Sequence, residues 1–181
     1  MVTIKDQFVA MAQPGDLALF HYPGFQFTSD AIEWFEGSGR VSHNAMVVDG
    51  AGGLSDVRLS GVIRSNIDDY IDGRTKIILR RVRGIGSADA LLLASLGLAA
   101  LGRDYGWLTA AWVGLGSLMQ LLGLGRLWWR MSVTRTESTC SGQYARDAAK
   151  VGFDLVPGKA PDNATPEDLY RSEAMWTVIE L

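Results

Sequence analysis

The only cysteine of the chain, Cys140, lies among small and polar residues in the stretch Thr-Glu-Ser-Thr-Cys-Ser-Gly-Gln-Tyr. Thr139 is a helix-capping residue type, and residues 140–151 have the composition of a helix. A helix N-terminus lowers the pKa of a thiol, because its free N–H groups and its dipole favour an anion. Cys140 is therefore a candidate nucleophile. The alternative is an inert structural thiol, since free cysteines are often buried.

A nucleophilic cysteine needs a base, usually an imidazole, and the chain contains two histidines. His43 opens an apolar segment that continues to Val48, so its ring could face a cleft while the rest of the strand is buried. The alternative is a strand-end histidine that faces water. His21 ends an earlier strand and is the second candidate. A zinc site made of both histidines and Cys140 is not supported by the ligand spacing.

The third member of such a site would be a carboxylate or amide that holds the imidazole in one tautomer. Asp56 is the best candidate, because it follows the glycine-rich turn at 49–53 and could neighbour His43 in an antiparallel pair. Asp49 and Asp30 are weaker candidates. The alternative interpretation of Asp56 is a strand residue that faces solvent.

The elements that must position these residues follow from hydrophobic periodicity. Apolar and alternating patterns predict strands at residues 16–21, 45–48, 54–59, 61–64 and 76–82. Short helical segments are predicted at residues 4–12, 29–36 and 66–70. The segment 54–59 alternates apolar and polar side chains, so we expect a half-buried strand there.

The second half of the chain has mainly helical patterns. Helices are predicted at residues 87–102, with Ser87 as the cap, at 140–151, and from a cap at Thr165, before a last strand at 175–179. Strands followed by helices indicate an α+β fold rather than a parallel βαβ sheet. The length of 181 residues suits a single domain.

An uncharged run of eighteen residues extends from Trp107 to Leu124. Its length is at the lower edge of the roughly 20 residues that a membrane span needs. We favour a helix buried in the core or an apolar flap over a pocket. A surface helix that contacts lipid or an apolar substrate comes second, and a true span comes third.

Composition excludes several classes of protein. Hydrophobic residues make up 48% and charged residues 20%, which is typical of a globular chain. The net charge of −3 argues against a general nucleic-acid binder, which needs a basic face. A single cysteine excludes an internal disulfide. The N-terminus lacks the basic and apolar regions of a signal peptide, so we expect a cytoplasmic protein at synthesis.

Three sequence blocks together resemble the NlpC/P60 papain-like cysteine hydrolases: residues 14–20, 42–48 and 139–144. Because His43 precedes Cys140, the order resembles the circularly permuted branch of this family, the YiiX/YaeF-like group. Two further blocks are similar to elements of that branch. They are Gly-Arg-Asp-Tyr-Gly-Trp at 102–107, like its G-x-x-Y-D-W/F element, and Thr-Pro-Glu-Asp-Leu at 165–169, like its closing T-P-x-D-L block.

The resemblance implies a permuted papain-like fold, an antiparallel sheet or half-barrel packed against helices, with the histidine strand before the cysteine helix. It implies one domain over residues 1–181 with an apolar helical insert at about 107–130. It also implies site roles: Cys140 as nucleophile, His43 as base, and Asp56 as the orienting acid, where the branch typically has glutamate. The oxyanion hole and its support would come from Tyr105, Ser141 and the backbone N–H of Cys140.

The activity implied is acyl transfer without metal or organic cofactor, on amide bonds of peptidoglycan peptides. Relatives in the permuted branch also suggest a lipid acyl hydrolase or acyltransferase, with 107–130 contacting a membrane surface or a partner protein. Arg40 and Arg126 are candidates to bind a substrate carboxylate, and a solvated basic linker is the alternative for Arg126. A non-catalytic module of a phage tail is a third possibility, and delivery to the cell envelope or within a phage particle would suit a peptidoglycan substrate.

Overall fold

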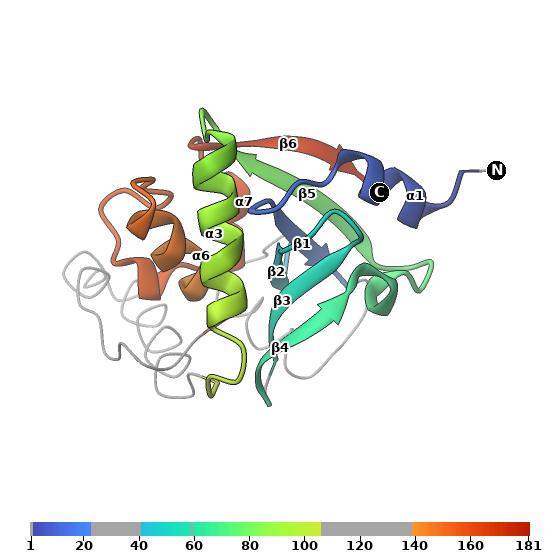
Figure 1. Cartoon of the computed structure of the whole chain (residues 1–181), viewed down its shortest axis with the longest axis horizontal. Helices are drawn as coiled ribbons and strands as arrows, with labels where there is room; N and C mark the ends of the chain where they lie inside the picture. Colours follow the sequence, from blue (N-terminus) through green and yellow to red (C-terminus); the bar gives the residue numbers. More distant parts are fainter. Residues whose placement is uncertain (1, 23–40, 59, 106–138) are drawn as a thin grey trace, which may run out of the picture.

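The structure, a computed structural model, describes residues 2–22, 41–58, 60–105 and 139–181. These residues form an α+β fold in which a six-stranded sheet packs against helices (Figure 1). The strand order is β4-β3-β2-β1-β5-β6, and every neighbouring pair is antiparallel. The predicted class, α+β with an antiparallel sheet against helices, is confirmed.

The bounds of the elements agree with most of the expected ones. The strands are β1 (Leu17–His21), β2 (His43–Val47), β3 (Gly53–Arg58), β4 (Gly61–Asn66), β5 (Lys76–Val82) and β6 (Met175–Glu180). The helices are α1 (Ile4–Met11), α3 (Ser87–Ala99), α6 (Cys140–Lys150) and α7 (Pro166–Arg171), with short 3-10 helices η1 (Ile67–Tyr70) and η2 (Pro161–Asn163). The predicted helix at 29–36 and the apolar run at 107–124 lie outside the described residues. Within the described ranges, no helix has the length and apolarity to cross a bilayer.

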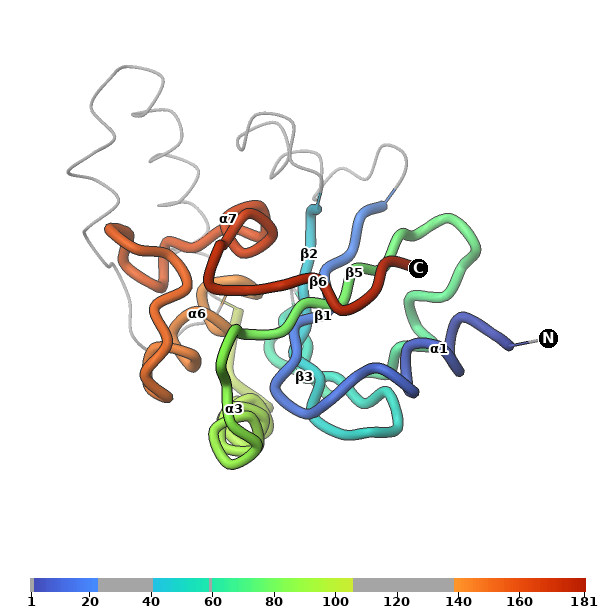
Figure 2. Tube along the Cα trace, turned by 90° about the horizontal axis from the view of Figure 1, so that it is seen from above, coloured from blue at the N-terminus to red at the C-terminus, as the bar shows by residue number. Residues whose placement is uncertain are grey.

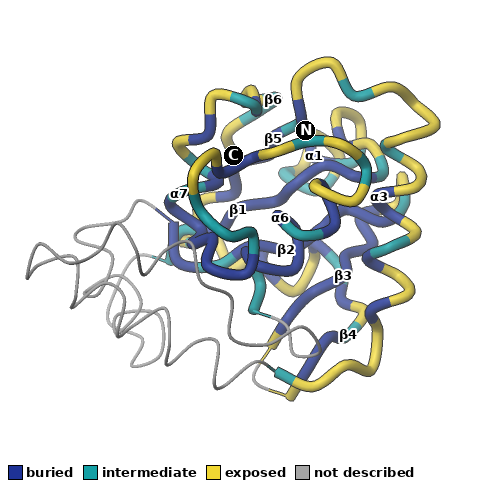
Figure 3. Tube along the Cα trace, turned by 90° about the vertical axis from the view of Figure 1, so that its left-hand side faces the viewer, coloured by how far each residue is buried: buried dark blue, intermediate teal, exposed yellow. Residues whose placement is uncertain are grey.

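Each face of the sheet has its own hydrophobic core, because successive side chains of a strand point to opposite faces. Leu17 and Leu19 of β1 pack in one cluster with Tyr144 of α6. Ala18 and Phe20 pack in the other cluster, which includes residues of α1 and η1. Figure 2 shows α3, α6 and α7 on one side of the strands and α1 on the other. Figure 3 shows that the central strands β1, β2 and β3 are mostly buried.

Strand β3 is buried on both faces rather than half-buried, so that expectation was wrong. All residues from Gly53 to Val57 are buried. On one face the hydroxyl of Ser55 donates to the carbonyl of Gly97 in α3, at 2.8 Å. A Cβ on Gly97 would lie 2.7 Å from the sulfur of Met46, so a larger residue here would force the methionine side chain to shift. The polar residues of β3 are therefore hydrogen-bonded inside the protein.

The start of α3 also differs from the prediction. The N-cap is Gly86, which offers no side-chain hydrogen bond, and Ser87 is the first helical residue. The helix ends at Ala99, and Gly102 follows after a further turn. This helix forms without a side-chain cap, because its inner face, including Leu93 and Gly97, packs against the rest of the protein.

Candidate active site

Helix α6 begins at Cys140, as the capping pattern predicts. The side chain of Thr139 accepts a hydrogen bond from the N–H of Gly142 at 3.2 Å. A Cβ on Gly142 would lie 2.9 Å from the carbonyl oxygen of Asp162, so glycine is needed where α6 meets η2. The thiol of Cys140, which is half-buried, therefore lies at the positive end of the helix dipole.

Two further hydrogen bonds attach the first turns of α6 to other parts of the fold. The hydroxyl of Ser141 donates to the carbonyl of Ala164 at 2.5 Å, which ties the helix to the segment before α7. The hydroxyl of Tyr144 donates to the carbonyl of Gly15 at 2.8 Å, which ties it to the turn before β1. Ser141 thus supports the helix start through its side chain, while its backbone N–H lowers the pKa of the Cys140 thiol.

His43 and Asp56 come together through the antiparallel pairing of β2 and β3. Asp56 lies opposite Ala45, and His43 is two residues from Ala45 on the same face. The Nε2 atom of His43 lies 2.8 Å from Oδ1 of Asp56. Asp56 is 0% exposed, which excludes the interpretation as a solvent-facing strand residue.

The second oxygen of Asp56 is held by two residues that sequence reasoning did not assign to the site. Oδ2 accepts from Nε of Arg58 at 2.7 Å and from the hydroxyl of Tyr70. Burial would raise the pKa of Asp56, but its bonds to His43, Tyr70 and Arg58 lower it to about 2. Asp56 is therefore a carboxylate at neutral pH, with Oδ1 directed at the imidazole.

Three aromatic rings orient this network. The rings of Phe20 and Tyr70 are stacked, with centroids 3.8 Å apart and an interplanar angle of 14°. The imidazole of His43 lies 5.9 Å from the Phe20 ring at 22°, and 6.2 Å from the Tyr70 ring at 23°. Near-parallel packing of this kind restricts rotation of the imidazole and keeps Nε2 on Asp56.

His43 also interacts with Cys140, and the two residues change each other's pKa. Because Nε2 is bound to Asp56, Nδ1 is the ring nitrogen that is free to exchange a proton with the thiol. Burial would lower the pKa of His43, but its bonds to Asp56 and Cys140 raise it above the ordinary range. Burial would raise the pKa of Cys140, but His43 and the backbone N–H groups of Asn44 and Ser141 lower it. These directions favour a thiolate–imidazolium pair.

Two tyrosines lie near the thiol. Tyr105, expected at the oxyanion hole, packs with Cys140 against Val57 and Val62. Burial and the negative charge of Cys140 raise the pKa of Tyr105 to about 12, so its hydroxyl keeps its proton and remains a donor. Tyr22, which sequence reasoning missed, follows β1. Burial, then the charge of Asp56 and a smaller effect of Cys140, raise its pKa to about 12.

Arg40, Arg126 and the insert at 107–130 lie outside the described residues. In the part of the chain that the structure describes, no three His, Cys, Asp or Glu side chains converge as a metal site, so His21, His43 and Cys140 do not form one there.

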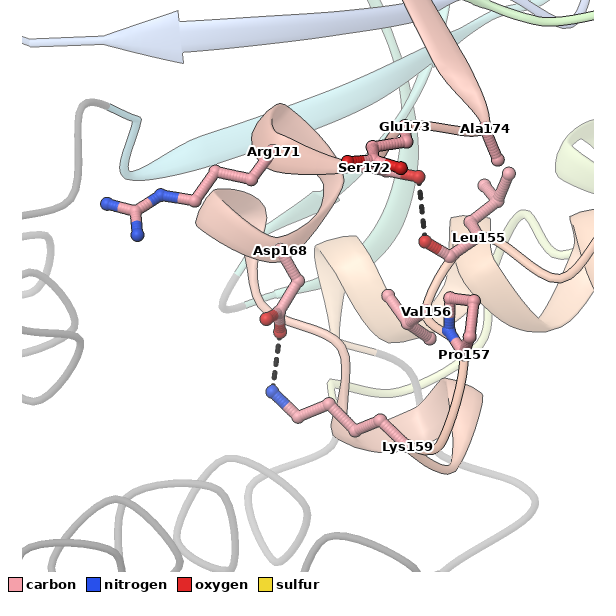
Figure 4. Close-up of a pocket in the computed structure, with 9 residues that line it drawn as sticks. All are labelled: Leu155, Val156, Pro157, Lys159, Asp168, Arg171, Ser172, Glu173 and Ala174. Atoms are coloured by element: carbon pink, nitrogen blue, oxygen red, sulfur yellow. Dashed lines mark hydrogen bonds and ion pairs between the residues drawn. The ribbon is translucent and has the colours of Figure 1, made fainter.

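A separate hollow of about 330 Å³ lies around α7 (Figure 4). Its lining runs from Leu155 to Lys159 and from Asp168 to Ala174, without Cys140, His43 or Asp56. Lys159 is bound to Asp168, and the hydroxyl of Ser172 donates to Leu155. Because none of the three candidate catalytic residues lines it, this hollow is separate from the candidate active site.

In comparisons with known proteins, no family model and no curated protein matches this chain.

Proposed function

We propose that the protein is a cysteine hydrolase with a circularly permuted papain-like fold, in which Cys140, His43 and Asp56 act as nucleophile, base and orienting acid. One observation carries the proposal: a fully buried carboxylate bonds Nε2 of His43 at 2.8 Å, while the same imidazole interacts with a thiol at a helix N-terminus. A structural thiol needs neither an imidazole partner nor a carboxylate behind that imidazole.

The reaction would be acyl transfer to the sulfur. Nδ1 of His43 removes the thiol proton, and the thiolate attacks the carbonyl carbon of the substrate. The backbone N–H of Cys140 and the hydroxyl of Tyr105 donate to the oxyanion. His43 then gives its proton to the leaving amine or alcohol as the thioester forms. Finally, His43 takes a proton from water, which cleaves the thioester and restores the thiol. Throughout, Asp56 stabilises the imidazolium and fixes its tautomer.

For the substrate, we propose an amide bond of a peptidoglycan stem peptide. The support is the resemblance of residues 14–20, 42–48 and 139–144 to the NlpC/P60 hydrolases. A small hydrolase of this kind would reach its substrate by delivery to the envelope or as part of a phage particle.

An acyl lipid at a membrane surface is a second candidate substrate. The outer face of α3 exposes Leu91 and Leu92, with 60% and 49% of their surface accessible, and residues 90–102 carry no charge. An apolar face of this kind, together with the uncharged run at 107–124, is typical of proteins that contact lipid.

The test is incubation of the purified chain with soluble peptidoglycan fragments and, separately, with phospholipid vesicles, followed by mass spectrometry of the products. Cys140→Ser is the control, because it keeps the size of the side chain and removes the thiolate. Cleaved stem peptides that depend on Cys140 would support the amidase. Released fatty acid would favour the lipid hydrolase. An ordinary, unreactive Cys140 thiol together with no product in either assay would leave a binding or assembly module.

A further inference from the structure

Asn44, the residue after His43, is an unexpected side chain for its position. It lies on β2 opposite Leu19 of β1, and its side chain points away from the His43 face. Only 1% of its surface is exposed. A buried strand position of this kind is usually occupied by an apolar residue, because burying an amide costs free energy unless the amide is hydrogen-bonded.

The amide of Asn44 is bound to the backbone of the cysteine itself. Its Nδ2 atom donates to the carbonyl oxygen of Cys140 at 3.2 Å. The orientation of the amide is determined, because a backbone carbonyl only accepts hydrogen bonds and the nitrogen must therefore face it. The Oδ1 atom is buried and has no hydrogen-bond partner in the described part of the chain. The bond to the carbonyl of Cys140 is therefore the one hydrogen bond that the buried Asn44 amide makes in the described part of the chain.

The backbone of Asn44 reaches the same residue. The pairing of β2 with β3 runs from Val47 to Ala45, and Asn44 lies just beyond it. Its backbone N–H instead lies near the thiol of Cys140 and lowers the pKa of that thiol. One residue of β2 therefore binds the carbonyl of Cys140 and lowers the pKa of its thiol, while the preceding residue supplies the imidazole.

We infer that Asn44 is a positioning residue, which holds the first turn of α6 against β2 and thereby keeps the sulfur of Cys140 at the imidazole of His43. This inference rests on the proposed function. The carbonyl of Cys140 is part of the helix backbone, so an amide that holds it fixes where the helix begins relative to the histidine strand. Without that bond, α6 stays attached through Ser141 and Tyr144, but the sulfur is free to move away from the ring.

The test is the pH dependence of Cys140 alkylation by iodoacetamide in Asn44→Leu, which keeps the size of the side chain and removes the donor. Among the described residues, the titratable groups that act on the thiol are His43 from β2, Tyr22 after β1 and Tyr105 after α3. All three stay in place in this variant. We expect alkylation at pH values below the native plateau to slow roughly tenfold, since there a thiol pKa higher by about one leaves tenfold less thiolate.

Two further variants separate positioning from general destabilisation. Asn44→Gln keeps the amide and should retain most of the native rate at pH 6. Ser172→Ala removes another buried bond from a side chain to a carbonyl, far along the chain at the end of α7, and should lower stability to urea while the alkylation profile stays native. If Asn44→Leu does not fold, Asn44→Ala is measured in the same way.

The outcomes are distinct. A native alkylation profile in Asn44→Leu, or in Asn44→Ala, would overturn the role of Asn44 and leave the Cys–His pair standing. An ordinary thiol titration in the native chain would overturn the proposed function and the role of Asn44 with it.

Discussion

Two buried aspartates, Asp16 just before β1 and Asp56 in β3, each bind an arginine, but in different ways. Asp16 receives two bonds from Arg81, Nε to Oδ1 and Nη2 to Oδ2, both at 2.7 Å. Asp56 receives one bond from Arg58, on Oδ2 alone, and its Oδ1 bonds His43. The arginine at Asp16 engages both carboxylate oxygens, whereas the arginine at Asp56 leaves one oxygen available to the imidazole.

The electrostatic consequences also differ. Burial raises the pKa of Asp16 in spite of its bonds to Arg81, because the cost of desolvating the carboxylate exceeds the gain from the ion pair. The pKa of Asp56 falls to about 2, because His43, Tyr70 and Arg58 together outweigh its burial. The geometry indicates that Asp16 links the turn before β1 to Arg81 of β5, while Asp56 stabilises a positive charge on the imidazole of His43.

The largest expected effect comes from changing each aspartate to asparagine. Asp56→Asn removes the charge behind His43, so the pKa of His43 falls and that of Cys140 rises. We expect hydrolysis to drop by about two orders of magnitude or more, and alkylation at pH 6 to slow at least about tenfold. Asp16→Asn should keep the alkylation profile but lower the free energy of unfolding by about 3 kcal/mol, measured in urea. Equal loss of alkylation in both variants would remove the distinction between the two aspartates.

A smaller effect is expected from the tyrosine that bonds Asp56. Tyr70→Phe raises the folded-state pKa of Asp56 from about 2 towards its ordinary value of 3.8. A carboxyl group with a lowered folded pKa stabilises the protein above its unfolded pKa, and this stabilisation is lost as pH falls through the folded pKa. Tyr70→Phe should therefore cost about 1.5–3 kcal/mol at pH 7 and less near pH 2.

Tyr144→Phe is the matched control, because its hydroxyl donates to a neutral carbonyl, that of Gly15. Its cost should be about 1 kcal/mol and independent of pH. Urea unfolding of both variants at pH 7 and at the lowest pH that keeps the fold distinguishes them. A pH-independent cost for Tyr70→Phe would contradict the charged state of Asp56.

The smallest effect should come from the arginines. Arg58→Lys keeps the charge of a side chain that is 42% exposed, so water and salt already weaken its interaction with Asp56. We expect it to cost under about 1 kcal/mol, while Arg81→Lys loses a two-bond fork to Asp16 and costs more. Thermal unfolding of the two variants tests the order. The reverse order would mean that Arg58 is the stronger anchor.

The sequence predicted the three central residues of the site because each depends on a local pattern. Thr139 caps the cysteine helix, His43 opens an apolar strand, and Asp56 follows a tight turn that brings β3 back along β2. The helix of residues 87–99 was likewise predictable from its apolar composition.

The remaining contacts of the site could not be predicted from the sequence, because they join chain segments that meet only in the folded protein. Tyr70 reaches Asp56 because β4 and η1 return beside β3, and no local pattern marks that return. The burial of β3 on both faces requires α3, which begins some thirty residues later in the chain. Arg58 shares a strand face with Asp56, so period-two spacing offered a signal, although strand-end arginines usually face solvent.

The central claim is that Cys140 and His43 form a reactive pair. The most direct test is to measure the rate of Cys140 alkylation by iodoacetamide from pH 4 to pH 10, in the native chain and in His43→Ala. Because the pKa of Cys140 is lowered and that of His43 raised, the native rate should form a plateau that extends well below pH 8 and falls only as the thiolate is protonated. His43→Ala should lose that plateau. An ordinary thiol titration near pH 8.5 in both proteins would contradict the pair and, with it, the proposed hydrolase.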